Sequence, residues 1–230
     1  MLRRLFSLTG VVPLGAFLVI HVVVNARAVR GEQAFAQSAD ALASLPALPL
    51  IELLFVLLPL VLHAGIGLWL VASRQPLTEP SPYSPGLAAA MRVTGLVALA
   101  FLAMHLPELR FRGLLHSPNG GELATRLAED LSSTWHGLPW RGAAYLLGSG
   151  CVLFHFSVGL WGFFARTRRG ADERSRRWVA MGVAVVGAAM WLLLVDAVVF
   201  HATGARLVGS QATDTTQIGP CPPAPSGSAP

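Results

Sequence analysis

Residues 5–24 read LFSLTGVVPLGAFLVIHVVV, a stretch without a charged side chain and with a single histidine, His21. A helix needs about 20 mostly apolar residues to cross the hydrocarbon core of a bilayer. Arg3 and Arg4 before the stretch and residues 26–28 after it, Ala-Arg-Ala, also fit a cleaved signal peptide. Because the apolar run is longer than an ordinary signal core, we expect a retained transmembrane helix.

Four further stretches of the chain have a similar length and composition. They are nearly free of charge and fall at about residues 48–72, 86–107, 141–165 and 178–200. Hydrophobic residues make up 53% of the 230-residue chain and charged residues only 13%, against roughly a quarter in soluble domains. The predicted fold class is therefore an all-α membrane protein with five transmembrane helices, formed by residues 1–204.

The basic residues predict the orientation of these helices. All 17 are arginines, and they lie between the apolar stretches, so the net charge of +5 does not indicate nucleic-acid binding. Six of them fall between residues 166 and 177, on the same side of the membrane as the N-terminus if the spans alternate. Cytoplasmic loops carry an excess of basic residues. The N-terminus is therefore predicted to be cytoplasmic and the C-terminus to lie outside.

Two segments lie outside the predicted spans. Residues 205–230 are rich in Pro, Ser, Gly and Thr, a composition that cannot bury a core, and are predicted to form a disordered tail. The outer loop from 108 to 139 is long and polar, with a predicted helical piece near residues 122–131. The two cysteines, Cys151 and Cys221, lie in contexts too different to suggest a disulfide.

The histidine neighbourhoods form an internal repeat. Helices one and two match helices three and four in two places: Thr9-Gly10 through His21 matches Thr94-Gly95 through His105, and His63 through Trp69 matches His155 through Trp161. The separation of His21 from His105 differs from that of His63 from His155 only by a difference in loop length. A parallel repeat of this kind predicts a pseudo-symmetric four-helix core, with the fifth helix at its periphery.

Position along each helix sorts the four histidines by depth. At 1.5 Å per residue, His21 lies roughly 24 Å from the inner end of its helix, and His105 falls at the same depth. His63 and His155 each follow the outer end of their helix by about 14 residues, roughly 21 Å down. We therefore predict an outer pair, His21 with His105, and an inner pair, His63 with His155.

Each histidine pair is predicted to bind the iron of one haem b. Neutral imidazole is a strong axial ligand, and two imidazoles leave no open iron position, which favours electron transfer over oxygen chemistry. Gly67 and Gly159 follow the inner histidines by one turn. They either leave room for the haem or only let helices pack closely, and close packing is the commoner role of such glycines.

Other polar and aromatic residues have simpler predicted roles. His116 and His136 in the outer loop, and His201 at the outer end of helix five, are predicted to be solvated. Trp69 and Trp161 are expected in an interfacial aromatic belt. Arg92, Arg27 and Arg110 are candidates to pair with haem propionates, although topology alone explains them equally well.

The same segments resemble the cytochrome b membrane-anchor subunit of succinate:quinone oxidoreductases, of the single-chain, five-helix, dihaem type that works with menaquinone. The similarity covers about residues 3–200. It is strongest at Arg4-Leu5 with Ser7, Gly10 and Pro13, at 21–25, at 57–63, at 92–95 through His105, and at 154–161. The resemblance implies that His63 and His155 bind the haem nearer the cytoplasm and that His21 and His105 bind the outer haem.

The resemblance also implies partners and a location. Such an anchor lies in the bacterial cytoplasmic membrane and docks an iron-sulfur subunit, which carries a flavoprotein subunit where succinate and fumarate interconvert. Electrons pass through the two haems to menaquinone, and a dimer of the whole complex is compatible with this arrangement. The anchor itself performs no dicarboxylate chemistry.

Two other functions fit the same pattern. The first is another bis-histidine anchor, as in formate dehydrogenase, hydrogenase or a transmembrane ferric reductase. The second is a haem-free transporter with polar residues at the repeat interface. The proteins that purify with the chain separate the anchors from one another, and a colourless protein indicates the transporter.

Glu52 is the candidate catalytic residue of a menaquinone site beside the outer haem. It precedes His63 by 11 residues, which on a regular α-helix places both on one face, with Glu52 roughly 16 Å nearer the outer surface. A partly desolvated carboxylate can relay the protons that quinone reduction takes up. A helix-start position near the headgroups explains Glu52 equally well. Asp196 on helix five is the second candidate.

Overall fold

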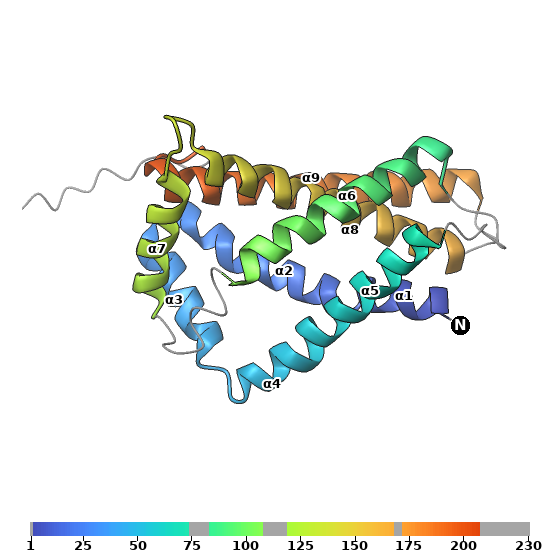
Figure 1. Cartoon of the computed structure of the whole chain (residues 1–230), viewed down its shortest axis with the longest axis horizontal. Coiled ribbons are helices and arrows are strands. Elements are labelled where there is room, and N and C mark those ends of the chain that lie inside the picture. Colours follow the sequence, from blue (N-terminus) through green and yellow to red (C-terminus); the bar gives the residue numbers. More distant parts are fainter. Residues whose placement is uncertain (1, 74–82, 108–118, 168–171, 208–230) are drawn as a thin grey trace, which may run out of the picture.

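The computed structural model describes residues 2–73, 83–107, 119–167 and 172–207, and this part of the chain folds into helices without a strand (Figure 1). The helices are α1 Leu2–Val11, α2 Pro13–Ala26, the 3-10 turn η1 Arg27–Arg30, α3 Glu32–Ala43, α4 Leu48–Glu52, the π-helix η2 Leu53–Leu57, α5 Leu58–Ala72, α6 Pro85–Leu106, α7 Gly120–Ser132, α8 Trp140–Thr167 and α9 Glu173–Thr203.

Five helical stretches in the described part are long and apolar enough to cross a membrane. They are Leu5–Arg30, Leu48–Ala72, Pro85–Leu106, Trp140–Thr167 and Glu173–Thr203. A spanning segment in lipid must satisfy its backbone polar groups internally, and a helix does so within one segment. The predicted fold class, an all-α membrane protein with five spanning helices, is confirmed.

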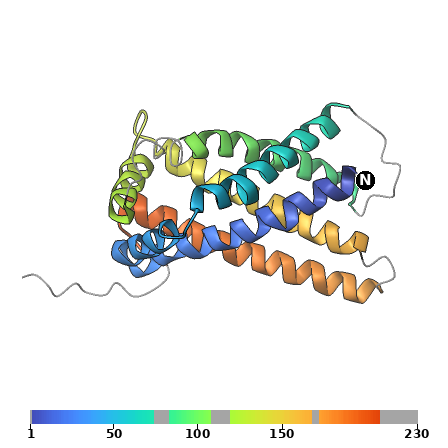
Figure 2. The ribbon, with the colours of Figure 1, turned by 90° about the horizontal axis from the view of Figure 1, so that it is seen from below.

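The spanning helices run along one bundle. Helix α8 packs against α6 and α9, helix α1 packs against α5 and α8, and α2 packs against α9. The N-terminus and the beginnings of α6 and α9 lie together at one end of the bundle, which we call the N-terminal end (Figure 1). Turning the molecule shows α9 along the flank of the bundle (Figure 2).

The first span is interrupted at Val12, between α1 and α2. Pro13 begins α2, a position where its missing N–H costs no helical hydrogen bond. One residue more lies between Gly10 and His21 than between Gly95 and His105 in the uninterrupted α6. The extra residue of the first repeat therefore falls on the segment that contains this interruption.

The second span contains the π-helical section η2, directly after Glu52. A π-helical turn closes with i→i+5 hydrogen bonds, so it holds about one residue more than an α-helical turn. The regular α-helical geometry from which Glu52 and His63 were placed on one face therefore does not hold, and the extra residue rotates Glu52 by roughly 100° relative to it. Both residues nevertheless line the same cavity.

Helices α3 and α7 cross the end of the bundle opposite the N-terminal end, and together we call them the cap (Figure 1). The Asn119 side chain caps α7 by accepting a 2.9 Å hydrogen bond from the Glu122 N–H. The Gly120 N–H donates a 2.7 Å hydrogen bond to Asp40 of α3. Helix α7 confirms the helical piece predicted near 122–131, whereas α3 was not predicted.

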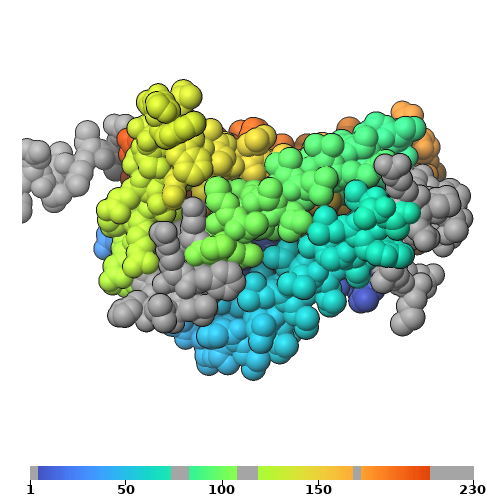
Figure 3. Space-filling model, viewed as in Figure 1, coloured from blue at the N-terminus to red at the C-terminus, as the bar shows by residue number. Residues whose placement is uncertain are grey.

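A cluster of buried residues lies where the cap meets the ends of the spans. It consists of Ala28, Phe35, Ala124, Leu127, Leu131, Tyr145 and Ala197. In the spans, apolar side chains such as Val61 and Val185 are each 67% exposed. Lipid solvates those side chains, whereas α3 and α7 lie beyond the hydrocarbon and must bury their apolar faces against protein. Side chains of α4, α5, α6 and α7 make up most of the coloured face seen in Figure 3.

The predicted boundary between the transmembrane domain and the C-terminal tail, at residue 205, falls close to the end of the described residues. Helix α9 ends at Thr203, and Gly204 follows it in the left-handed conformation typical of a helix C-terminus. The described residues end at Leu207, so the predicted tail lies almost entirely outside them.

We predict that Gly120→Ala destabilises the cap. A Cβ atom at Gly120 would overlap the backbone carbonyl of Ala36, which no side-chain rotation can relieve. Overpacking of this kind costs about 1–3 kcal/mol, so the thermal unfolding midpoint of the purified protein should fall. Gly121→Ala is the matched control, because its Cβ would meet only the Asn119 side chain at 3.4 Å. Equal midpoints for the two variants would contradict the packing described here.

Candidate functional site

All four predicted histidines line one cavity inside the bundle. Its volume is about 2510 Å³, and its walls come from α1, α2, α4, η2, α5, α6, α8, α9 and the cap. A pocket for one small ligand measures roughly 300–1,000 Å³. The cavity therefore has room for more than one bulky ligand.

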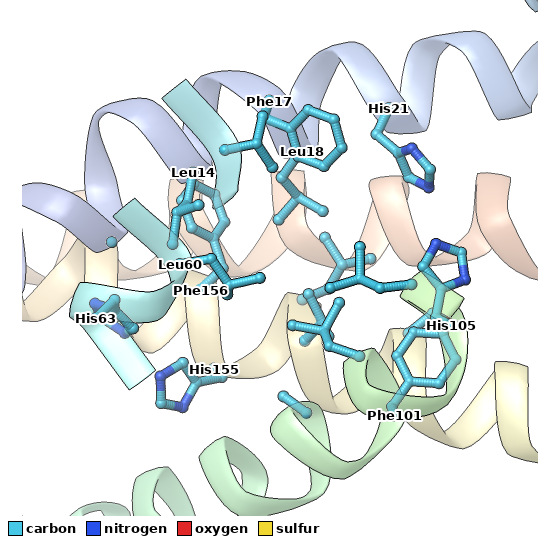
Figure 4. A pocket seen from close by; sticks show the side chains of 18 of the residues that line it. Leu14, Phe17, Leu18, His21, Leu60, His63, Phe101, His105, His155 and Phe156 are labelled. Carbon is cyan, nitrogen blue, oxygen red and sulfur yellow. The ribbon is translucent and has the colours of Figure 1, made fainter. Parts of the chain in front are cut away.

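The structure brings the four histidines together in the two pairs predicted from depth (Figure 4). The ring centroids of His21 on α2 and His105 on α6 lie 5.9 Å apart, and those of His63 on α5 and His155 on α8 lie 6.2 Å apart. Two imidazoles on opposite sides of one metal, with metal–nitrogen bonds of about 2 Å and ring radii of about 1 Å, have centroids roughly 6 Å apart. The spacing of each pair fits one metal between its rings.

Apolar side chains separate the two pairs. Leu14 and Leu18 of α2, Leu60 of α5 and Phe156 of α8 lie between them in the cavity (Figure 4). An apolar lining of this kind offers water few hydrogen-bond partners between the two histidine pairs. The cavity is therefore divided into two sites at different depths.

Backbone carbonyls orient both rings of the inner pair. His63 Nδ1 lies 3.0 Å from the Phe6 carbonyl oxygen, and His155 Nδ1 lies 3.1 Å from that of Met91. A carbonyl oxygen only accepts hydrogen bonds, so each Nδ1 must carry the proton and donate it. The Nε2 atom of each ring is then left with a free lone pair. A hydrogen bond from Nδ1 to a carbonyl is the arrangement that prepares a histidine to bind a metal through Nε2.

Two glycines make room for the inner rings. A Cβ atom at Gly10 would lie 2.5 Å from Cε1 of His63, and a Cβ atom at Gly95 would lie 2.9 Å from Cε1 of His155. Both distances are shorter than ordinary contacts between carbon atoms. Any side chain at either glycine would push the neighbouring histidine out of its present position.

The threonines before these glycines bond to backbone carbonyls of their own helices. Thr9 Oγ1 lies 3.0 Å from both the Leu5 and the Phe6 carbonyl oxygens, and Thr94 Oγ1 lies 2.8 Å from that of Ala90 and 3.5 Å from that of Met91. A hydroxyl has one proton to donate, so the bond from Thr94 to Ala90 is the stronger one. The Thr-Gly motif of the repeat therefore supports the inner histidines through its glycine. The sequence showed this motif twice, but it gave no indication of the role.

The outer pair has different support. Nδ1 of His105 lies 3.4 Å from the hydroxyl of the buried Tyr145, and the His105 ring stacks on Phe101. The His21 ring packs against Phe17 and His105, and the described residues supply no hydrogen bond to it. A hydroxyl both donates and accepts, so Tyr145 constrains the tautomer of His105 less than a carbonyl would.

The glycines that follow the inner histidines line the cavity. A Cβ atom at Gly67 would lie 3.3 Å from the Phe6 ring, whereas one at Gly159 would lie 3.9 Å from the Met91 side chain, an ordinary contact distance. Gly67 thus lets α5 pack closely on α1, and both glycines leave space in the cavity. The structure is compatible with both roles considered for them, room for a haem and close helix packing.

His201 is buried, so the prediction that it is solvated is wrong. Its side chain is 7% exposed, lines the cavity, and packs edge-on against Phe35 with ring centroids 4.9 Å apart. Helix α3, which was not predicted, covers this end of α9. His136 is exposed as predicted, and His116 lies outside the described residues.

Glu52 is half-buried and lines the cavity, although η2 alters its angular position relative to His63. Asp196, the second candidate, is fully buried and accepts a hydrogen bond from the Leu207 N–H, so it faces no open space. The structure therefore leaves Glu52 the better placed of the two to meet a ligand.

The arginines that were candidates for propionate binding lie in different places. Arg92 lines the cavity near the N-terminal end, as does Arg166, which was not among the candidates and donates a 2.9 Å hydrogen bond to Ser7. Arg27 is half-buried, and its Nε has no hydrogen-bond partner among the described residues. Arg110 lies outside the described residues.

The two histidines of each pair suit a metal ion whose other ligands come from a cofactor. Among the described residues, no three His, Cys, Asp or Glu side chains gather to hold a metal ion. Each histidine pair offers two ligands on opposite sides of a gap. A haem iron fits this arrangement, because the porphyrin supplies its four equatorial nitrogens and the protein its axial ligands.

The chain is similar to a curated bacterial protein. It is 34% identical, over 176 residues, to the succinate dehydrogenase cytochrome b558 subunit of Bacillus subtilis strain 168. The matched region covers 76% of this chain and 83% of that protein. No protein-family model and no solved structure matches the chain. A five-helix membrane bundle with paired histidines and this degree of identity establish that the chain belongs to the family of succinate dehydrogenase cytochrome b subunits.

Proposed function

We propose that this chain is the membrane anchor of a succinate:menaquinone oxidoreductase, and that it carries electrons between an iron-sulfur subunit and menaquinone through two bis-histidine b haems. The strongest evidence for this proposal is that the same kind of hydrogen bond orients both histidines of the inner pair. His63 and His155 receive equivalent carbonyl acceptors, from Phe6 and Met91, on equivalent helices. Side chains that only filled a bundle would not need their tautomer fixed twice in the same way.

The histidines would provide the axial ligands of both haems. His63 and His155 would bind one iron through Nε2, and His21 and His105 would bind the other. Haem b, when bound, supplies a one-electron iron couple whose two axial positions are filled by protein. The residues of this chain hold the rings in place, exclude water with the apolar cavity wall, and keep two sites at separate depths.

The N-terminal end of the bundle is proposed to face the cytoplasm and to dock the iron-sulfur subunit. Helix α9 begins there with Arg174, Arg176 and Arg177, beside Trp178, which is 62% exposed. Basic residues favour the cytoplasmic side, and an exposed aromatic ring beside them is typical of an interface. The flavoprotein subunit, which would hold the dicarboxylate site, would sit beyond the iron-sulfur subunit. The membrane would be the bacterial cytoplasmic membrane.

Glu52 is proposed to exchange protons with menaquinone near the outer pair. It lies in the wall of the cavity that also contains His21 and His105. Two-electron reduction of a quinone takes up two protons, so a carboxylate that meets the quinone can relay them. This assignment is independent of the haem ligands.

Purification of the assembled complex tests the proposal as a whole. We expect a coloured membrane complex that contains this chain together with a flavoprotein and an iron-sulfur protein. A formate dehydrogenase or hydrogenase as the co-purifying partner would replace the succinate assignment with one of the other anchors. A colourless preparation would refute haem binding altogether and favour a transporter.

Substitution of either histidine of a pair should remove the same haem. His63→Ala or His155→Ala should remove one haem, and His21→Ala or His105→Ala should remove the other, because each pair shares one iron. Reduced-minus-oxidised spectra of the complex measure which component is lost. If His21→Ala and His63→Ala removed the same haem, the pairing would be wrong. His136→Ala, at an exposed histidine, should change neither component.

The glycines behind the inner rings should prove necessary for the inner haem alone. In Gly10→Ala or Gly95→Ala the new methyl group displaces His63 or His155, so the content of that haem should fall by at least half. Gly65→Ala is the control, since a Cβ atom there meets nothing within 4 Å. A normal inner-haem spectrum in both glycine variants would show that the rings tolerate displacement, and would remove this support for their role as ligands.

Glu52→Gln should slow quinone chemistry without disturbing the haems. We expect at least tenfold slower electron transfer from succinate to a menaquinone analogue, because the amide cannot relay protons. The exposed Glu32, which does not line the cavity, gives the control variant Glu32→Gln. Unchanged quinone activity in Glu52→Gln would make Glu52 a structural residue of the helix start.

A further inference from the structure

A tight turn joins α7 to α8 at the cap end of the bundle. The backbone N–H of Trp135 donates a 3.0 Å hydrogen bond to the Leu138 carbonyl, and the N–H of Leu138 donates one of 3.0 Å to the Trp135 carbonyl. His136 and Gly137 between them have φ angles of 50° and 78°. Two successive positive φ angles are typical of a type I′ hairpin turn. We call residues 134–140 the Trp turn.

The side chains of the Trp turn are mostly apolar, and they are exposed. Trp135 and Leu138 are each 67% exposed, and Trp140 is exposed as well. Residues 131–140 contain no Asp, Glu, Lys or Arg. Exposed apolar side chains that gather in one segment mark a surface that contacts something other than water.

The charges that flank the Trp turn neutralise each other. Arg141 and Asp130 form a 2.7 Å ion pair, and the Arg141 guanidinium also lies over the Trp140 ring, 5.2 Å from its centroid. A cation paired with a carboxylate and placed on an aromatic face costs less to bring into a medium of low polarity than a free one.

The backbone of the Trp turn is also suited to such a medium. The N–H groups of Trp135, Leu138 and Trp140 all donate to carbonyls within the turn, the last at 2.8 Å to Leu138. Pro139 has no N–H to satisfy. Because unpaired backbone groups are costly near lipid, a turn that pairs its own is favoured there over an open loop.

The direction of the Trp turn places it along the membrane surface. The spans run along the bundle, so the plane of the bilayer lies across it. The connection between α7 and α8 projects sideways from the bundle at the cap end in both views (Figures 1 and 2). It therefore points along the bilayer plane and not away from the membrane.

The length of α8 places the turn at the level of the lipid headgroups. Helix α8 has 28 residues, which at 1.5 Å per residue is about 42 Å. A bilayer with its headgroups is about 40–45 Å thick. Trp140, the first residue of α8, therefore lies in the headgroup region at the cap end, and the Trp turn precedes it directly.

We propose that the Trp turn inserts into the headgroup region of the bilayer and anchors the start of α8 there. Trp side chains prefer this region because the ring is apolar and the indole N–H is a hydrogen-bond donor. Interfacial anchors set the height and tilt of a spanning helix. Helix α8 carries His155, so the anchor would hold the helix of this histidine at a constant depth.

Fluorine NMR of the assembled, oxidised complex tests the proposal. The complex is labelled with fluorotryptophan and placed in vesicles of phosphatidylcholine and phosphatidylglycerol, and Trp135→Phe or Trp135→Tyr identifies the Trp135 resonance. Three paramagnetic probes are compared: a nitroxide on the lipid headgroup, a nitroxide near the end of an acyl chain, and a soluble gadolinium chelate. Trp191, near the middle of α9 and partly exposed, is the internal control and should broaden most with the acyl-chain probe.

We expect the headgroup nitroxide to broaden the Trp135 resonance at least twofold more than either other probe. Equal or greater broadening by the gadolinium chelate would place Trp135 in water and overturn the proposal. Protection from all three probes would show that protein covers the turn, either a second copy of the chain or another subunit, and would also overturn it. None of these outcomes depends on haem, so a haem-free complex would contradict the proposed function without affecting this inference.

Discussion

The hydrogen bond from Nδ1 of each inner histidine to a backbone carbonyl of a neighbouring helix is the interaction on which the site depends. It joins α5 to α1 through His63 and Phe6, and α8 to α6 through His155 and Met91. It fixes ring rotation and tautomer together, which leaves Nε2 of both rings free for a metal. Because a carbonyl belongs to the rigid helix backbone, the register of two helices is tied to the position of the ligand atoms.

This interaction requires helices that approach each other closely without closing the bundle. Gly10 and Gly95 permit the approach, since each lies directly against a histidine ring. The spans otherwise bury few residues, because lipid solvates their apolar side chains. A cavity of about 2510 Å³ can persist in such a bundle, with the cap supplying a separate protein core at one end. A ligand that binds only the folded bundle would add to its stability.

The sequence was sufficient to predict the spans and the pairing of the histidines by depth. Both follow from local properties, namely the length of apolar runs and the fixed rise of a helix. The burial of His201 could not be predicted, because it depends on α3 folding back over the end of α9. The spacing of Phe35, Ala39 and Leu42 on α3 is an amphipathic pattern that would have indicated this helix.

Two further features depend on geometry that composition does not reveal. The π-helical section after Glu52 ends just before Pro59, whose missing N–H interrupts the α-helical hydrogen bonds, but a proline in an apolar run does not indicate which hydrogen-bond pattern replaces them. The Thr-Gly motif was visible as a repeat, but its relation to the histidines is a contact between different helices. Both features depend on how neighbouring turns or helices meet, which the local sequence does not specify.

The central claim is that one polypeptide holds two haems, each between two histidines from different helices. The ratio of haem b to this chain in the purified complex tests it most directly, with haem measured by absorbance after extraction and the chain by quantitative amino-acid analysis. The account predicts two haems per chain. A ratio of one, or of zero, would contradict it.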